Sequence, residues 1–297
     1  MPKEERSNTR LPALTALLIS ATVFLGACAS PSTTTSGPGL ARISQAQTLK
    51  LGYREDAMPF SFKGADGKPA GYSVQLCQRV AASLQSQLKL AKLDVQWVPV
   101  TATSRMQAVS DGTIDVECGS TTRTLSREQT VDFSNTIWVE GASFVTLATA
   151  TSTNRAGDLN GKRVGVIPGT TTDSLLKSLA ARGVSPAFVT VQSHTDGVAA
   201  VRDGRVDAYA TDRLILVGEV LRQPSAAALK LSDDYLSIEP YSLMMRRDAV
   251  LRLAVNRALA EIYRSGEIVK IFRSTFPAGA MPSHLVEAAY VLNALPE

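Results

Sequence analysis

The chain repeats one short pattern, and this repeat constrains the fold more than any other feature. Residues 108–121 read AVSDGTIDVECGST, and residues 200–213 read AVRDGRVDAYATDR. Each copy is typical of a helix end, a tight Asp-Gly turn and a short strand that ends in polar residues. Because α/β sheets place ligands beyond the carboxyl ends of their strands, two such ends indicate two similar lobes that hold one ligand between them.

A second, weaker echo supports the same division. Residues 49–53 (LKLGY) and 162–166 (KRVGV) each have the pattern expected of the first strand of a lobe. Along the rest of the chain, strand-like runs alternate with amphipathic helical runs, which predicts parallel sheets with helices on their faces. The expected fold class is α/β, with each lobe a sheet flanked by helices.

Two long β-favouring runs are the natural crossings between the lobes, and two crossings make a hinge that can close around a small ligand. They cover residues 136–149 and 236–245. The expected strands are 49–54, 93–98, 113–118, 162–167, 187–191 and 206–210. The expected helices are 73–88, 104–109, one that begins at the Gly-Thr cap of 169–173, 195–201, 249–265 and 269–276.

The N-terminus has the pattern of a secretory signal. Three basic residues, Lys3, Arg6 and Arg10, precede an uncharged stretch that ends in small residues before Cys28. This arrangement resembles a bacterial lipobox, which implies that Cys28 is lipidated and anchors the mature protein to a membrane in the periplasm. The alternative is an uncleaved anchor, although the stretch is shorter than the roughly 20 apolar residues that a span needs.

These patterns divide the chain into five parts. The segment after Cys28 is rich in Ser, Thr, Pro and Gly and cannot bury a core, so a flexible tether is expected there. The expected parts are a lipoprotein signal peptide at 1–27, a tether at 28–45, the first part of lobe 1 at 46–146, lobe 2 at 147–238, and at 239–297 the return to lobe 1 with a C-terminal tail.

The composition excludes several classes of function. The 297 residues are 44 % hydrophobic and 20 % charged, as in soluble globular proteins, and they are enough for two domains. The net charge of +4 comes from scattered basic residues, so no nucleic-acid partner is expected. We find no metal-ligand cluster and no Ser-His-Asp pattern, and we expect no metal, cofactor or catalytic residue.

The cysteine count leaves one question open. Once Cys28 is set aside, Cys77 and Cys118 remain. An exported protein can form disulfides, but sequence cannot place two cysteines within the required distance. A bridge and two buried thiols both stay open.

Polar residues follow both echoed strands. Ser120 and Thr122 follow the first, and Arg127 lies five residues beyond Thr122. Hydroxyls with a guanidinium suit a carboxylate, because arginine offers a planar fork that matches two oxygens. The alternative is a helix cap with an exposed arginine. In the second copy Asp212 takes the place of Ser120, where a carboxylate can hold an ammonium group or cap the next helix.

These residues resemble a known family. The segments 52–55 (GYRE), 71–73 (GYS), 117–122 (ECGSTT) and 169–171 (GTT), with Arg127, are similar to those of the periplasmic glutamate/aspartate-binding proteins of ABC importers, which are family 3 solute-binding proteins. The similarity runs from about residue 46 to about residue 276. It implies the two-lobed type II periplasmic-binding-protein fold, joined by two hinge crossings, in a monomer that delivers L-glutamate or L-aspartate to an ABC permease.

The resemblance also implies roles for single residues of the first lobe. Arg127, Ser120 and Thr122 would hold the α-carboxylate of the ligand. Arg54 and Arg105 would face its side-chain carboxylate. For each of these two arginines the alternative is a solvated surface position.

Further roles fall in the second lobe. Asp212 would take the α-ammonium group, and Thr170 and Thr171 would add donors from a helix N-terminus. His194 matches a histidine near the ligand, and its alternative is a structural hydrogen bond. Three arginines against one aspartate leave this site at +2, facing a ligand at −1. Because glutamine would leave a buried arginine unpaired, we expect the site to reject it.

The sequence also departs from the family. Residues 241–245 of the return crossing lack a cysteine expected there, so no family disulfide is transferred, and the tail at 277–297 diverges. The alternative function is a periplasmic cyclohexadienyl dehydratase, an enzyme of similar sequence that acts on prephenate or arogenate. Such an enzyme needs a carboxylic acid or similar group for proton transfer, and Glu55 and Glu117 lie near the expected site, so the sequence does not exclude it. We expect a binding protein and not an enzyme.

Overall fold

The computed structural model describes residues 37–223 and 226–296, which belong to one compact unit. The expected signal peptide and the lipidation site Cys28 lie outside the described residues. Of the helices that are described, none is long and apolar enough to cross a membrane.

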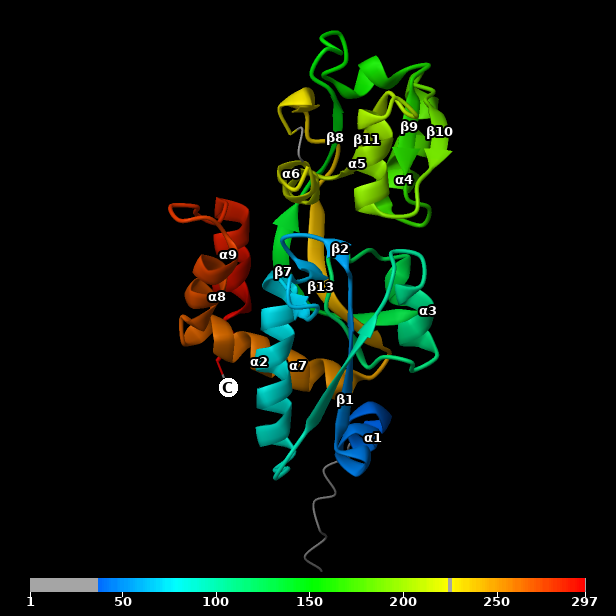
Figure 1. Ribbon diagram of the computed structural model, residues 1–297. Helices are drawn as coiled ribbons and strands as arrows, with labels where there is room; N and C mark the ends of the chain where they lie inside the picture. Colours follow the sequence, from blue (N-terminus) through cyan, green and yellow to red (C-terminus); the bar gives the residue numbers. More distant parts are fainter. Residues whose placement is uncertain (1–36, 224–225, 297) are drawn as a thin grey trace, which may run out of the picture. The chain divides into compact units, whose positions relative to one another are not determined.

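Two sheets organise the described residues, and each belongs to one lobe (Figure 1). In the first sheet three strands run parallel and β13 runs antiparallel to both of its neighbours. Its strands, in spatial order, are β5 (Asp94–Pro99), β1 (Thr48–Tyr53), β6 (Val116–Glu117), β13 (Glu239–Arg246) and β7 (Val131–Glu140). Leu49 and Leu51 of β1 lie two residues apart, so they share one face of the strand, and both are fully buried.

The second sheet also combines parallel strands with one antiparallel strand. β10, β9 and β11 run parallel, and β8 pairs antiparallel with its two neighbours. The spatial order is β10 (Ala187–Thr190), β9 (Arg163–Val166), β11 (Ala208–Asp212), β8 (Ala142–Leu147) and β12 (Leu229–Leu231). The two-lobed α/β fold expected from the sequence is confirmed.

Helices pack on each sheet with the periodicity read from the sequence. Leu76, Val80 and Leu84 of the second helix recur at helical spacing and are completely buried. The helices are α1 (Pro38–Ala46), α2 (Tyr72–Gln87), α3 (Arg105–Ser110), α4 (Thr171–Ser178), α5 (His194–Arg202), α6 (Arg213–Leu221), α7 (Ala249–Arg264), α8 (Glu267–Thr275) and α9 (His284–Asn293). Short 3-10 turns are η1 (Arg127–Gln129), η2 (Ala156–Leu159), η3 (Leu179–Arg182) and η4 (Ala226–Ala228).

The two copies of the repeated pattern fold alike. In each, a helix ends two residues before a glycine with positive φ, Gly112 in one and Gly204 in the other. In the first copy the amide of Ile114 donates to the carbonyl of Ala108, and in the second the amide of Val206 donates to the carbonyl of Ala200. The repeat therefore marks equivalent positions in the two sheets.

The lobes join where β7 passes into β8 and where the chain returns through β13. Gly141 separates β7 from β8, and a Cβ there would lie 2.5 Å from the carbonyl oxygen of Ser237. The two crossings thus approach so closely that only glycine fits. The expected lobe boundary at 146/147 differs from the structure, because β8 already belongs to the second sheet.

The expected tether at 28–45 also reaches too far. Residues 38–46 form α1, and Leu40 and Ile43 on one face of this helix are buried in the core of the first lobe. Three-residue spacing of two apolar side chains is enough to seat one helical turn on a neighbouring core, even in a segment poor in apolar residues.

A small sheet and a disulfide complete the first lobe. The sheet was not expected from the sequence and consists of β2 (Asp56–Ala57), β3 (Ser61–Lys63) and β4 (Pro69–Ala70). The open question about the cysteines is resolved in favour of a bridge, because Cys77 of α2 and Cys118 at the end of β6 are bonded. In the diverged tail, Val286 of α9 is fully buried in the first-lobe core.

Candidate functional site

Polar side chains from both lobes meet at one cavity. It lies where β6 and β11 end and where α3, α4 and α5 begin. Eight of the nine expected ligand-binding residues line it: Arg54, Arg105, Ser120, Thr122, Thr170, Thr171, His194 and Asp212. The cavity volume is about 20 Å³, the order of one water molecule, so a ligand of amino-acid size enters only when side chains or lobes move apart.

The ninth expected residue, Arg127, lies beside the cavity and not among the residues that line it. Its Nη1 donates to the carbonyl oxygen of Thr122 at 2.7 Å, and its Nη2 donates to the carbonyl oxygen of Gly169 at 3.1 Å. Burial lowers the pKa of Arg127, and Glu239 opposes this shift. The guanidinium therefore links a loop of the first lobe to the start of α4 in the second.

Arg54 and Arg105 are buried, with 2 % and 4 % of their surfaces exposed, so neither is the surface residue of the alternative interpretation. Nη2 of Arg54 donates to Oδ1 of Asp56 at 2.7 Å. Burial lowers the pKa of Arg105 to about 10, while Glu117 acts in the opposite direction. Among the described residues, neither arginine has a hydrogen-bond partner for its Nε.

Asp212 is buried at the end of β11 and precedes α6, but its side chain makes no capping hydrogen bond. The helix-cap alternative therefore does not hold. Oδ2 of Asp212 accepts a hydrogen bond from the Tyr241 hydroxyl, and Oδ1 has no partner among the described residues. Burial raises the pKa of Asp212 to about 7, with Glu239 adding to the shift and the Tyr241 hydrogen bond opposing it.

Thr170 and Thr171, at the start of α4, already make hydrogen bonds within the protein. Thr170 is the N-cap, and its hydroxyl accepts from the amide of Asp173, as the Gly-Thr pattern predicts. The Thr171 hydroxyl donates to Oε2 of Glu239 at 2.8 Å. It also lies 3.4 Å from the Thr122 hydroxyl of the first lobe.

His194 combines the two interpretations considered for it. Its ring lines the cavity, and its Nδ1 lies 2.7 Å from the Tyr209 hydroxyl. Burial lowers the pKa of His194 to about 3, so the imidazole is neutral at physiological pH. Its backbone N–H donates to Oδ2 of Asp56 in the first lobe at 3.0 Å.

The sequence analysis missed part of the electrostatics. Asp56, Glu117 and Glu239 carry carboxylates close to the three arginines, and Glu117 and Glu239 are buried. Together with Asp212 they make four carboxylates against three guanidinium groups. The expected net charge of +2 for the site is therefore wrong. Asp56 lies only two residues from Arg54, and this nearness is the one signal that the sequence offers. The sequence offers no such signal for Glu239, because its neighbours in the structure come from distant segments of the chain.

The comparisons with known proteins agree with this architecture. The sequence pattern of the family described as "Bacterial extracellular solute-binding proteins, family 3" matches residues 49–278. The L-glutamate/L-aspartate-binding protein of Pseudomonas aeruginosa is 34 % identical over 83 % of this chain and 82 % of its own length.

Solved structures show the same fold. An ancestral arginine-binding protein bound to arginine has a TM-score of 0.71 and 28 % identity, with 78 % of this chain and 99 % of that chain covered. The ancestral amino acid-binding protein AncCDT-1, a precursor of cyclohexadienyl dehydratase, has a TM-score of 0.70 and 25 % identity, covering 80 % of this chain and 99 % of that chain.

Proposed function

The chain belongs to family 3 of the bacterial extracellular solute-binding proteins, and we propose that it captures L-glutamate or L-aspartate and delivers it to an ABC permease. One observation carries the proposed specificity. Arg54 Nε, Arg105 Nε and Asp212 Oδ1 are buried beside one cavity, and none has a hydrogen-bond partner among the described residues. Buried polar atoms without partners are costly, so they favour a ligand that satisfies them.

An acidic amino acid has the complementary groups. Its ammonium fits Asp212, and its α-carboxylate fits the hydroxyls of Ser120 and Thr122 with the neighbouring Arg127. The second carboxylate then lies against Arg54 and Arg105. Charge-assisted hydrogen bonds of this kind are stronger than neutral ones, and guanidinium groups suit carboxylates in particular.

Of the two arginines proposed to face the second carboxylate of the ligand, Arg105 has the greater effect on specificity. Arg54 has Asp56 as a partner in the protein, whereas Arg105 makes no ion pair with any described residue. The amide of a glutamine ligand would leave the buried Arg105 without a carboxylate at ion-pair distance, with Glu117 as its main neighbouring negative charge. Discrimination between an acidic amino acid and glutamine therefore depends more on Arg105 than on the combined charge of the three arginines.

A thermal-shift screen against the twenty amino acids tests the proposal. A ligand that binds only the folded protein raises Tm, and the shift grows with the logarithm of its concentration over Kd. We expect L-glutamate and L-aspartate to give the largest shifts, with glutamine and arginine well below them. A larger shift with arginine, or none with either acidic amino acid, would contradict the proposal.

The dehydratase alternative has one observation in its favour. Glu117 is buried near Arg105, its Oε1 has no described partner, and Oε2 accepts from Thr121. A carboxyl group in that setting can serve in proton transfer. Incubation with prephenate or arogenate separates the two functions, since we expect no aromatic product and a dehydratase would form one.

We also propose that Cys28 carries a lipid that anchors the protein on the periplasmic side of a membrane. The basic residues, the uncharged stretch and the small residues before Cys28 support this. Labelling of cells with a fatty-acid analogue tests it. Wild-type protein should take up label and Cys28→Ala should not, whereas label in both would contradict the assignment.

A further inference from the structure

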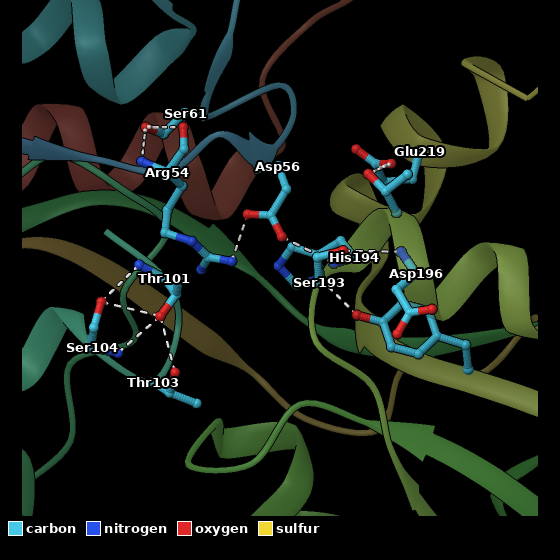
Figure 2. A network of polar contacts seen from close by, with 12 residues as sticks. Arg54, Asp56, Ser61, Thr101, Thr103, Ser104, Ser193, His194, Asp196 and Glu219 are labelled. Atoms are coloured by element: carbon cyan, nitrogen blue, oxygen red, sulfur yellow. Dashed lines mark hydrogen bonds and ion pairs between the residues drawn. The ribbon is translucent and has the colours of Figure 1, made fainter. Parts of the chain in front are cut away.

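One carboxylate of the first lobe reaches across to a helix of the second. Asp56 accepts from Nη2 of Arg54 through Oδ1 at 2.7 Å and from the backbone N–H of His194 through Oδ2 at 3.0 Å. Figure 2 shows Asp56 between these two partners. Arg54 and Asp56 belong to the first lobe, while His194 is the first residue of α5 in the second. A single side chain thus joins a proposed ligand-binding arginine to the opposite lobe.

The helix end explains why a carboxylate suits this place. The N-cap Ser193 already accepts from the amide of Asp196. The His194 amide is one of the first donors of α5 and has no partner within the helix, so Asp56 satisfies it from outside. The partial positive charge of a helix N-terminus adds to the attraction.

Met58, in the turn after Asp56, also lies close to the second lobe. We call residues 55–59 the closing turn. A Cβ placed on Gly218 of α6 would lie 2.7 Å from the carbonyl oxygen of Met58, and real Cβ atoms do not approach a backbone oxygen so closely. Only glycine at 218 therefore lets α6 approach the closing turn as it does here.

We propose that the closing turn is the contact by which the lobes close over the ligand, with Asp56 as the residue that ties Arg54 to the N-terminus of α5. The bond to His194 forms when the lobes approach and breaks when they separate. Asp56 is a positioning residue, since it acts on the ligand through Arg54. It holds Nη2 of that arginine and leaves Nε for the ligand.

The inference rests on the proposed binding function, but its main readout does not need a ligand. The His194 amide has Asp56 as its acceptor, so its hydrogen exchange reports this contact directly. The Gly197 amide donates to the carbonyl oxygen of Ser193 within the same lobe and serves as an internal control. Exchange of both amides can be followed by NMR with and without L-glutamate.

Two variants test the contact, one through charge and one through shape, and each has a matched control. Asp56→Asn keeps the shape and removes the charge, and Gly218→Ala keeps every charge and blocks the approach of α6. Asp203→Asn is the matched control for the first, because Asp203 is exposed and pairs with Arg202 inside one lobe. Gly157→Ala is the control for the second, since a Cβ on Gly157 meets nothing within 4 Å.

In Asp56→Asn one uncharged oxygen replaces the two carboxylate oxygens that accept from Arg54 and His194, so we expect His194 to exchange about tenfold faster or more, with Gly197 unchanged. Gly218→Ala should also speed His194 exchange, and in stopped-flow experiments it should release L-glutamate about tenfold faster. Affinity alone is a poor readout for Asp56→Asn, because loss of a negative charge beside Arg54 also strengthens attraction for an anionic ligand. Both control variants should behave as wild type.

Wild-type His194 exchange in Asp56→Asn would overturn the proposal. If Asp56→Asn also speeds Gly197 exchange, the substitution has loosened the helix as a whole, and Gly218→Ala becomes the test. Wild-type rates of His194 exchange and of ligand release in Gly218→Ala would then overturn the proposal. Failure of wild-type protein to bind L-glutamate and L-aspartate would contradict the proposed function instead. The exchange measurements without ligand would still test the contact.

Discussion

The Tyr241 hydroxyl on β13 donates a 2.5 Å hydrogen bond to Oδ2 of Asp212 at the end of β11, so a strand of one sheet holds the cavity carboxylate of the other. The bond leaves Oδ1 of Asp212 without a described partner beside the cavity. An ammonium group of a ligand has this oxygen as its natural acceptor. In the proposed mode of binding, Asp212 would therefore join recognition of the ligand to the crossing between the lobes.

The first prediction concerns pH. Burial raises the pKa of Asp212 to about 7, and only the ionised form attracts an ammonium group. Below pH 7 the free protein carries a proton on Asp212 that binding must remove, so Kd for L-glutamate should rise by about tenfold for each pH unit lost. Above about pH 8 it should level off. Calorimetry from pH 5.5 to 8.5 measures this.

His194 does not interfere, since its pKa of about 3 keeps it neutral over that range. Asp212→Asn should bind weakly and with little dependence on pH, because it has no proton to lose. A flat Kd in the wild-type protein would show that the ammonium group of the ligand sits elsewhere.

The second prediction concerns Arg105. Arg105→Gln removes a buried guanidinium that makes no ion pair with any described residue, so the proposed ligand loses a charged partner. We expect affinity for L-glutamate to fall by about 2–3 kcal/mol and discrimination against L-glutamine to narrow. The control is Arg202→Gln on the exposed face of α5, which should leave both constants unchanged. Equal losses for the two ligands would mean that Arg105 binds the α-carboxylate.

The third prediction concerns the crossing. A Cβ at Gly141 would lie 2.5 Å from the Ser237 carbonyl oxygen, so Gly141→Ala forces the two crossings apart. The free energy of unfolding should fall by about 1–3 kcal/mol, as for other overpacked sites. Urea denaturation measures it, with Gly157→Ala as the unstrained control. A loss no larger than that of the control would show that the crossings can separate at no cost.

The fourth prediction concerns the bridge between Cys77 and Cys118. It closes a loop of 41 residues, and its loss in the Cys77→Ala/Cys118→Ala variant should cost about 2–4 kcal/mol of unfolding free energy. Cys118 lies two residues before Ser120, so affinity for L-glutamate should fall as well. If the variant loses stability but keeps its affinity for L-glutamate, the bridge stabilises the fold and does not affect the binding site.

The repeated pattern carried most of what the sequence could predict. Because both copies place a helix end, an Asp-Gly turn and a strand in the same order, they indicated Ser120 and Asp212 as equivalent strand ends, and both line the cavity. The cap at Thr170 followed from local side-chain chemistry, which sequence reports directly.

Other features depend on contacts between distant segments. Glu239 of the return crossing accepts from Thr171 at the start of α4, and Asp56 of the first lobe accepts from the amide of His194 in the second. The lobe boundary was misplaced because a β-favouring run does not reveal that Gly141 divides it between two sheets. Charge counts taken from sequence omit such partners, which is why the net charge of the site was wrong.

The central claim is that the cleft selects an amino acid with two carboxylates. Competition calorimetry of wild-type protein with L-glutamate, L-aspartate and L-glutamine at pH 8 tests it most directly. We expect at least one acidic amino acid to bind about a hundredfold more tightly than L-glutamine, the cost of a buried charge without a partner. Equal affinity for L-glutamine, or tighter binding of it, would contradict the account.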